Sequence, residues 1–136
     1  MPKTIPAIER YMTKSPYSIG THDPLSKAHS LMHEHGIRHL PVLHGAELVG
    51  VVSDRDLHLV ESLTEVDPSK VTVEEAMTTI VYAVAPSTPL DEVVGTMATK
   101  KCGSAVVMEA GKVVGIFTTI DLCKAFAEHL HGRKHA

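Results

Sequence analysis

Apolar positions along this chain form the same pattern twice: a short strand, an amphipathic helix, a pair of apolar strands and a second helix. The first strand of each pattern is predicted at residues 16–19 and 80–84, which contain β-forming residues. Each helix that follows has apolar residues at helical spacing on one face. These residues are Leu25, Ala28 and Met32 in the first helix and Leu90, Val93, Val94 and Met97 in the second.

Both of these helices begin with residues that commonly stabilise a helix N-terminus. Asp23 is expected to cap the first helix, with Pro24 at its first position, and the helix is expected to run to about Glu34. Thr88 and Asp91 have capping-box spacing at the start of the second helix.

The remaining segments complete each pattern. The strand pairs turn through glycine and show little alternation, which is typical of strands covered on both faces. They are predicted at residues 40–43 with 48–52 and at 104–108 with 113–117. Helical turns are predicted at 8–12 and 73–77, the last helix of each pattern at about 54–63 and 119–130, and a linker at 64–72.

The two patterns are an internal repeat. The segment GVVSDRDL, which begins at Gly50, recurs as GIFTTIDL beginning at Gly115, an offset of 65 residues. The same offset carries Met12-Thr13 onto Met77-Thr78. A half of roughly 60 residues buries little surface alone, so the two halves are expected to pack together.

Composition adds limits to this picture. Only 4% of the 136 residues are aromatic, so the core must be largely aliphatic, and the net charge of −3 argues against nucleic acid as the main partner. No apolar run approaches the ~20 residues that span a bilayer, and no signal peptide opens the chain. Cys102 and Cys123 lack CxxC spacing, which indicates a reducing compartment. A cytoplasmic protein without a membrane partner is therefore expected.

The repeated β-α-β-β-α order resembles the CBS domain, whose tandem pair is called a Bateman module. The resemblance extends from about Ile8 to Leu130 and rests on GVVSDRD at 50–56, GIFTTID at 115–121 and GIRHLPV at 36–42. It implies an α/β (α+β) fold of two CBS repeats, at residues 8–63 and 71–131, packed about a pseudo-two-fold axis. It also implies a homodimer, and a ligand site in the cleft between the repeats.

A hydroxyl residue followed three positions later by aspartate occurs in both copies, as Ser53 with Asp56 and as Thr118 with Asp121. At a helix start, the hydroxyl and the free backbone N–H groups suit a phosphate, and the carboxylate can accept hydrogen bonds from the two hydroxyls of a ribose. The resemblance implies these contacts with adenosine ligands. The alternative is a capping box, which needs no ligand, and both roles are compatible.

Arg38 and His39 lie between the first helix and the next strand. The resemblance implies that Arg38 contacts a ligand phosphate, and His39 is a further candidate. The alternative is a surface pair that caps helix carbonyls. In the second copy Gly103 and Ser104 replace them, so the second site lacks this cation. That site is then empty, binds a nucleoside, or takes charge from the first repeat.

The adenine of such a ligand needs a flat apolar slot. Candidates are Ile19 in the first copy and Tyr82 and Val84 in the second. For Ile19 and Val84, a plain core position is the alternative.

The ten histidines include an i, i+4 pair at His29 and His33, a spacing that can bind zinc or nickel. No carboxylate or cysteine stands at a matching position, so no functional metal site is predicted. The chain has no Walker loop, HExxH or nucleophile elbow, which favours a binding module over an enzyme.

The sequence therefore predicts a regulatory module that binds an adenosine-containing ligand, such as AMP, ADP, ATP, NAD or S-adenosylmethionine. It requires no cofactor, and it would act on an unknown effector protein. A ligand-free dimerisation scaffold and a metal-responsive histidine-rich protein are the alternatives.

Overall fold

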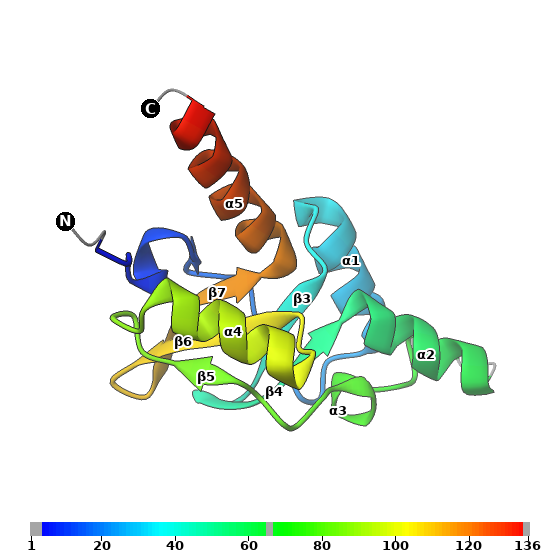
Figure 1. Cartoon of the computed structure of the whole chain (residues 1–136). Coiled ribbons are helices and arrows are strands. Elements are labelled where there is room, and N and C mark those ends of the chain that lie inside the picture. Colours follow the sequence, from blue (N-terminus) through cyan, green and yellow to red (C-terminus); the bar gives the residue numbers. More distant parts are fainter. Residues whose placement is uncertain (1–3, 65–66, 135–136) are drawn as a thin grey trace. The chain divides into compact units, whose positions relative to one another are not determined.

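The computed structural model describes residues 4–64 and 67–134, and these ranges contain helices and strands in the repeated order that the sequence predicts (Figure 1). The elements are η1 (Ile8–Arg10), β1 (Thr13–Lys14), β2 (Ile19–Gly20), α1 (Leu25–His35), β3 (His39–His44), β4 (Glu47–Ser53), α2 (Asp54–Thr64), α3 (Val73–Ala76), β5 (Ala83–Val84), α4 (Leu90–Lys100), β6 (Ser104–Glu109), β7 (Lys112–Thr118) and α5 (Thr119–Lys134). The predicted α/β class is confirmed.

The chain forms two compact units. The repeat-1 unit comprises Pro16–Val81, and the repeat-2 unit comprises the N-terminal segment as far as Ser15 together with the chain from Tyr82 onward. Packing of the units about a pseudo-two-fold axis stays a prediction.

The repeat-1 unit contains a three-stranded sheet of order β2-β3-β4, in which β2 is parallel to β3 and β3 is antiparallel to β4. Helices α1 and α2 pack beside this sheet and against each other (Figure 1). The core is aliphatic, as the composition predicts, and includes fully buried Leu25, Leu40 and Val52.

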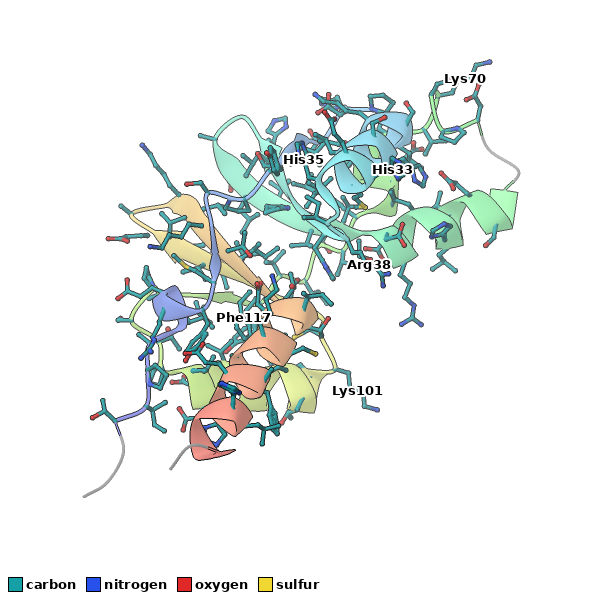
Figure 2. The ribbon with its side chains drawn as sticks, turned by 90° about the horizontal axis from the view of Figure 1, so that it is seen from above. His33, His35, Arg38, Lys70, Lys101 and Phe117 are labelled. Atoms are coloured by element: carbon teal, nitrogen blue, oxygen red, sulfur yellow. The ribbon has the colours of Figure 1, made fainter. Side chains whose placement is uncertain are left out.

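The repeat-2 unit has the same arrangement with one more strand. Its sheet has the order β1-β7-β6-β5, with β5 parallel to β6. Helix α4 packs against β6 and α5 against β7. Phe117 is the largest fully buried side chain of the chain's described part and lies in this core (Figure 2).

Each unit is completed by the segment with which the other sequence repeat begins. Ile8, in the first turn of repeat 1, is fully buried in the core of the repeat-2 unit. Val73, in the first turn of repeat 2, is fully buried in the core of the repeat-1 unit. The following residues close the open sheet edges, since Thr13 pairs with Ile116 of β7 and Thr78 pairs with Val51 of β4.

The predicted helix caps of α1 and α4 are wrong. Pro24 and Pro89 are the N-cap residues, and neither helix has a side-chain cap. The Asp23 carboxylate instead accepts the Gly20 N–H at 2.8 Å, and the Thr88 hydroxyl accepts the Ala85 N–H at 3.2 Å. These short polar side chains close the turn that enters the helix, a local use that competes with capping.

The first strand of each repeat is shorter than predicted, because only two residues of each segment pair with the neighbouring strand. Ile19 and Gly20 pair with β3, and Ala83 and Val84 pair with β6. Conversely, a full capping box joins Thr72 and Glu75 at the start of α3, which the sequence analysis missed.

Two repeat-related glycines allow the exchanged segments to approach the sheet. A Cβ on Gly50 would lie 2.8 Å from the Thr78 carbonyl oxygen and 2.8 Å from the Met77 Sδ. At Gly115 the corresponding obstacle is the Met12 side chain. A methionine can move, whereas a backbone carbonyl in a sheet pairing moves only with its strand.

We therefore expect Gly50→Ala to destabilise the protein by about 1–3 kcal/mol, because the pairing of Thr78 with β4 must shift. The measurement is urea denaturation. Gly95→Ala is the matched control: Gly95 lies within α4 with nothing near its Cβ position, so this change should stabilise by roughly 0.5–1 kcal/mol. Equal stability of Gly50→Ala and wild type would show that the exchanged segment does not constrain this position.

Candidate functional site

The first candidate site lies at the junction of β4 and α2. Ser53 ends the strand and Asp56 lies in the first turn of the helix. The Asp56 Oδ2 accepts the Ser53 N–H at 2.9 Å, and the Ser53 Oγ accepts the Asp56 N–H at 3.1 Å. This reciprocal pair is the capping box that the sequence analysis gave as an alternative, and it is confirmed here.

Arg38 and His39 are brought to the same junction. His39 is paired with Ser53 across the sheet, and the Arg38 carbonyl accepts the Asp54 N–H at 2.9 Å. The Arg38 side chain is exposed, and within residues 4–64 and 67–134 no carboxylate forms an ion pair with it (Figure 2). An unpaired guanidinium beside a helix N-terminus is available to an anion.

His39 is half-buried, and its pKa lies below its usual value of 6.5. Burial is the largest cause; the Asp56 charge opposes it by raising the pKa, and the Arg38 charge lowers it further. His39 is therefore mainly neutral at pH 7, so Arg38 rather than His39 carries a positive charge between α1 and β3.

Ile19, the proposed adenine contact of the first copy, is only 3% exposed and belongs to the aliphatic core of the repeat-1 unit. It pairs with Val42 of β3. In this unit its side chain has the core role that the sequence analysis gave as the alternative.

The second candidate site lies at the junction of β7 and α5, and its hydrogen bonds differ from those of the first. Asp121 is only 9% exposed and accepts the Thr118 N–H at 2.9 Å and the Thr118 hydroxyl at 3.2 Å. It also accepts the hydroxyl of Thr13, from the N-terminal segment, at 3.1 Å. Sequence reasoning missed Thr13, although its recurrence as Thr78 was a signal.

Tyr82 and Val84 lie on β5 or beside it, and both are half-buried against the core of the repeat-2 unit. The Lys100 Nζ lies 5.5 Å from the centre of the Tyr82 ring, a cation–π distance. Gly103, which stands where Arg38 stands in the first copy, repeats only the backbone contact: its carbonyl accepts the Thr119 N–H at 3.2 Å.

Among the residues that the structure describes, no three histidine, cysteine, aspartate or glutamate side chains are grouped so that they could hold a metal ion. His29 instead bonds to Glu61 of α2 at 2.5 Å, a carboxylate partner that the sequence spacing did not reveal. No helix in the described ranges is long and apolar enough to cross a membrane.

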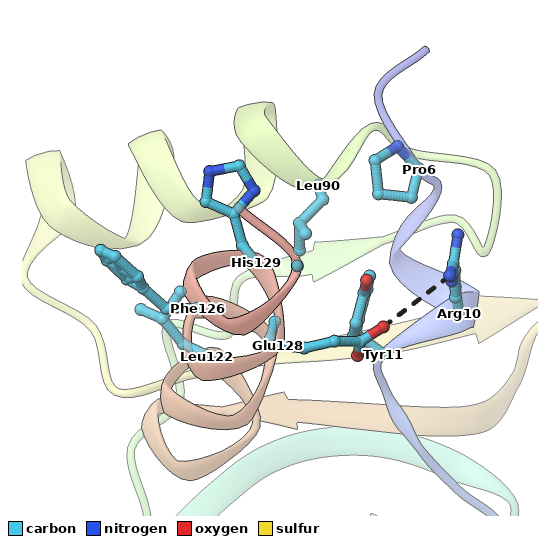
Figure 3. A pocket seen from close by; sticks show the side chains of 10 residues that line it. Pro6, Arg10, Tyr11, Leu90, Leu122, Phe126, Glu128 and His129 are labelled. Atoms are coloured by element: carbon cyan, nitrogen blue, oxygen red, sulfur yellow. Dashed lines mark ion pairs between the residues drawn. The ribbon is translucent and has the colours of Figure 1, made fainter. Parts of the chain in front are cut away.

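A cavity of about 580 Å³ lies in the repeat-2 unit (Figure 3). It is bounded by the N-terminal segment, the start of α4 and one face of α5 from Leu122 to Gly132. Its walls are mainly apolar, and an Arg10–Glu128 ion pair of 3.8 Å lies at its edge. None of the candidate site residues lines it.

The sequence model of the CBS domain matches residues 8–60 and 73–128, which are most of the chain. The chain belongs to the CBS-domain family. Inosine-5'-monophosphate dehydrogenase of Korarchaeum cryptofilum is 31% identical to it over 123 residues. These residues are 90% of this CBS-domain chain but 25% of the dehydrogenase, so the chain spans only a quarter of that enzyme's length.

Solved structures give the same family. A putative acetoin utilization protein (AcuB) from Vibrio cholerae is 29% identical, with a TM-score of 0.85 and 98% of both chains covered. The CBS domain pair of protein MJ0100, solved with 5'-methylthioadenosine and S-adenosyl-L-methionine, is 25% identical, with a TM-score of 0.83 over 93% of this chain and 99% of that one. CBSX2, solved with AMP, is 26% identical, with a TM-score of 0.74 over 90% and 97%.

The charges around His39 give a test of the first junction. Asp56→Asn should lower the pKa of His39 and Arg38→Gln should raise it, because these charges act on the imidazole in opposite directions. The measurement is an NMR titration of the His39 ring. Movement of the pKa in the same direction in both variants would contradict the geometry.

The same titration has a consequence for stability. Because the pKa of His39 is lowered by folding, the unfolded chain binds a proton at His39 more readily than the folded chain does. The free energy of unfolding therefore has its full value, as far as His39 is concerned, above pH 6.5. It decreases as the pH falls from 6.5 toward the pKa of His39 in the folded chain. His39→Gln should remove that part of the acid-side loss of stability.

Proposed function

We propose that this CBS-domain protein is a regulatory module that binds an adenosine-containing ligand and acts by binding rather than catalysis. The observation that carries the proposal is the meeting of Arg38, His39, Ser53 and Asp56 at one strand-to-helix junction. Related CBS pairs with adenosine compounds bound, MJ0100 and CBSX2, support the ligand class.

The chemistry of the first junction suits a phosphorylated ligand. Asp56 offers a carboxylate to ribose hydroxyls, and Arg38 offers an unpaired cation to a phosphate, both beside the N-terminus of α2. The adenine would lie beside β2. In this proposal Ser53 changes partner when the ligand binds, from the Asp56 N–H to the phosphate.

The second junction suits a different ligand. It has Thr118 and Asp121, but Gly103 offers no charge where Arg38 does. We therefore assign it lower affinity for phosphate and infer that Tyr82 and Val84 contact an adenine there.

The homodimer and the effector protein that the resemblance implies belong to the same proposal. Helix α5 exposes three large apolar side chains, Ile120, Phe126 and Leu130, each by at least half, which supports a partner surface on this helix. Ligand binding would act on the effector by favouring one arrangement of the protein over another.

Adenosine, AMP and S-adenosylmethionine should raise the melting temperature in a concentration-dependent way, because a ligand that binds only the folded state stabilises it. Guanosine and cytidine compounds should have a much smaller effect. The measurement is a thermal-shift series up to millimolar ligand.

The control for this series is the double variant Asp56→Asn/Asp121→Asn, in which each amide can still accept a backbone N–H but carries no charge. It should lose most of the adenosine response. If no adenosine compound shifts wild type, the ligand-free scaffold takes the place of this proposal.

Arg38→Ala should weaken AMP binding at the first site by about tenfold to a hundredfold, because one charged hydrogen bond contributes roughly 1.5–3 kcal/mol. Adenosine, which has no phosphate, should bind nearly as before. Calorimetric titration of AMP and adenosine into both proteins measures the difference. Equal AMP affinity would show that Arg38 faces solvent and that the helix N-terminus alone holds the phosphate.

A further inference from the structure

The two candidate aspartates differ in how much hydrogen-bonding capacity they have left. An ionised carboxylate has about four acceptor positions, two on each oxygen. Because a ribose presents two neighbouring hydroxyls, a carboxylate needs two free acceptor positions to bind both. The side-chain contacts within each unit decide how many positions are free.

Asp121 is nearly saturated by its own unit. Its Oδ2 accepts the Thr118 N–H at 2.9 Å and the Thr118 hydroxyl at 3.2 Å. Its Oδ1 accepts the Thr13 hydroxyl at 3.1 Å, and that hydroxyl also lies 3.4 Å from Oδ2. Only one acceptor position, on Oδ1, remains, and the residue is 9% exposed.

Asp56 has most of its capacity free. Its Oδ2 accepts only the Ser53 N–H, because the Ser53 hydroxyl is itself an acceptor for the Asp56 N–H. In the part of the chain that the structure describes, no other donor bonds to this carboxylate. Both oxygens of Asp56 can therefore accept a ribose hydroxyl.

Thr13 and Thr78 make this comparison a matched one. Thr78 pairs with Val51 as Thr13 pairs with Ile116, so the two threonines have equivalent backbone positions in their units. Only the Thr13 hydroxyl bonds to the aspartate of its junction. The backbone is repeated, and the side-chain contact is not.

We propose that Thr13 is a specificity-determining residue of the second site, where its hydroxyl competes with a ribose hydroxyl for the Asp121 carboxylate. This inference rests on the proposed function, because it takes Asp121 as the ribose acceptor. A ribose can donate both of its hydroxyl hydrogen bonds to Asp121 only when Thr13 turns away. The second site is thereby weakened for intact ribonucleosides, independently of the missing cation at Gly103.

The N-terminal segment holds Thr13 in this place. The Ile8 N–H bonds to the Thr88 carbonyl at 2.8 Å, and the Ser15 N–H bonds to the Val114 carbonyl at 3.1 Å. Ile8 is fully buried in the core of the repeat-2 unit. The segment is therefore anchored on both sides of Thr13, so only the side chain has to rotate for a ribose to enter.

The test uses the full chain with the first site weakened by Asp56→Asn, which keeps an acceptor for the Ser53 N–H. Adenosine and 2',3'-dideoxyadenosine are titrated calorimetrically into this variant with and without Thr13→Val. Valine keeps the β-branched shape of threonine and removes the hydroxyl. Adenosine should bind about tenfold more tightly with Thr13→Val, as expected for freeing one charged hydrogen bond. Dideoxyadenosine, which has no ribose hydroxyls, should bind with unchanged affinity.

Two controls match this variant. Thr13→Ser keeps the hydroxyl and should behave as threonine. Thr78→Val, at the repeat-related position, should leave adenosine affinity unchanged.

Three results would overturn the inference while the proposed function stands, as shown by adenosine binding to wild type. These are unchanged or weaker adenosine binding in Thr13→Val, equal gains for adenosine and dideoxyadenosine, and the same gain in Thr13→Ser. Absence of adenosine binding to wild type at millimolar concentration would overturn the proposed function and this inference together.

Discussion

The structure depends on the closing of two sheet edges by exchanged segments. Each repeat forms a three-stranded sheet whose outer strand, β4 or β7, would leave unpaired N–H and C=O groups. The residue pairs Thr78–Val51 and Thr13–Ile116 close these edges. The apolar residues just before them, Val73 and Ile8, are fully buried in the cores that they reach. Neither unit is complete without the segment with which the other sequence repeat begins.

The same exchange sets the chemistry of the candidate sites. Each closing segment lies against a strand that leads directly into the helix carrying Asp56 or Asp121. The threonine of the segment is therefore within reach of the junction, and its hydroxyl becomes a partner of the carboxylate in one unit only. Thr13 both pairs with the edge strand β7 and occupies an acceptor position of Asp121. A threonine that completes the sheet can therefore affect the affinity proposed for the second site.

The two junctions differ at several equivalent positions, which include His39 with Ser104, Asp54 with Thr119 and Arg55 with Ile120. Three further differences change the charge or the contacts around the site residues. Arg38 has its counterpart in Gly103, His35 in Lys100, and Ser53 in Thr118. The first change removes a cation beside the helix N-terminus. The second places a cation over Tyr82, whereas Tyr17 in the first copy stacks on the His35 ring at 3.7 Å. The third changes the role of the hydroxyl. The Ser53 Oγ accepts the Asp56 N–H, whereas the Thr118 Oγ1 donates to the Asp121 carboxylate. A duplicated backbone thus carries two environments of different charge and hydrogen-bonding capacity.

The sequence alone determined the repeat and the order of its elements, because these follow from local periodicity. The pairing of Ser53 with Asp56 follows from a short spacing at one helix start, and the place of Arg38 beside them was implied by the resemblance to the CBS domain. It also placed the two strand pairs within about one residue of their observed ends. Only the tertiary structure decided which segment completes which unit, since that choice depends on contacts between residues far apart in the chain. For the same reason it decided that Thr13 bonds to Asp121, 108 positions away, and that Asp23 and Thr88 close turns instead of capping helices. Side-chain partners of this kind depend on three-dimensional distance, which periodicity and spacing do not specify.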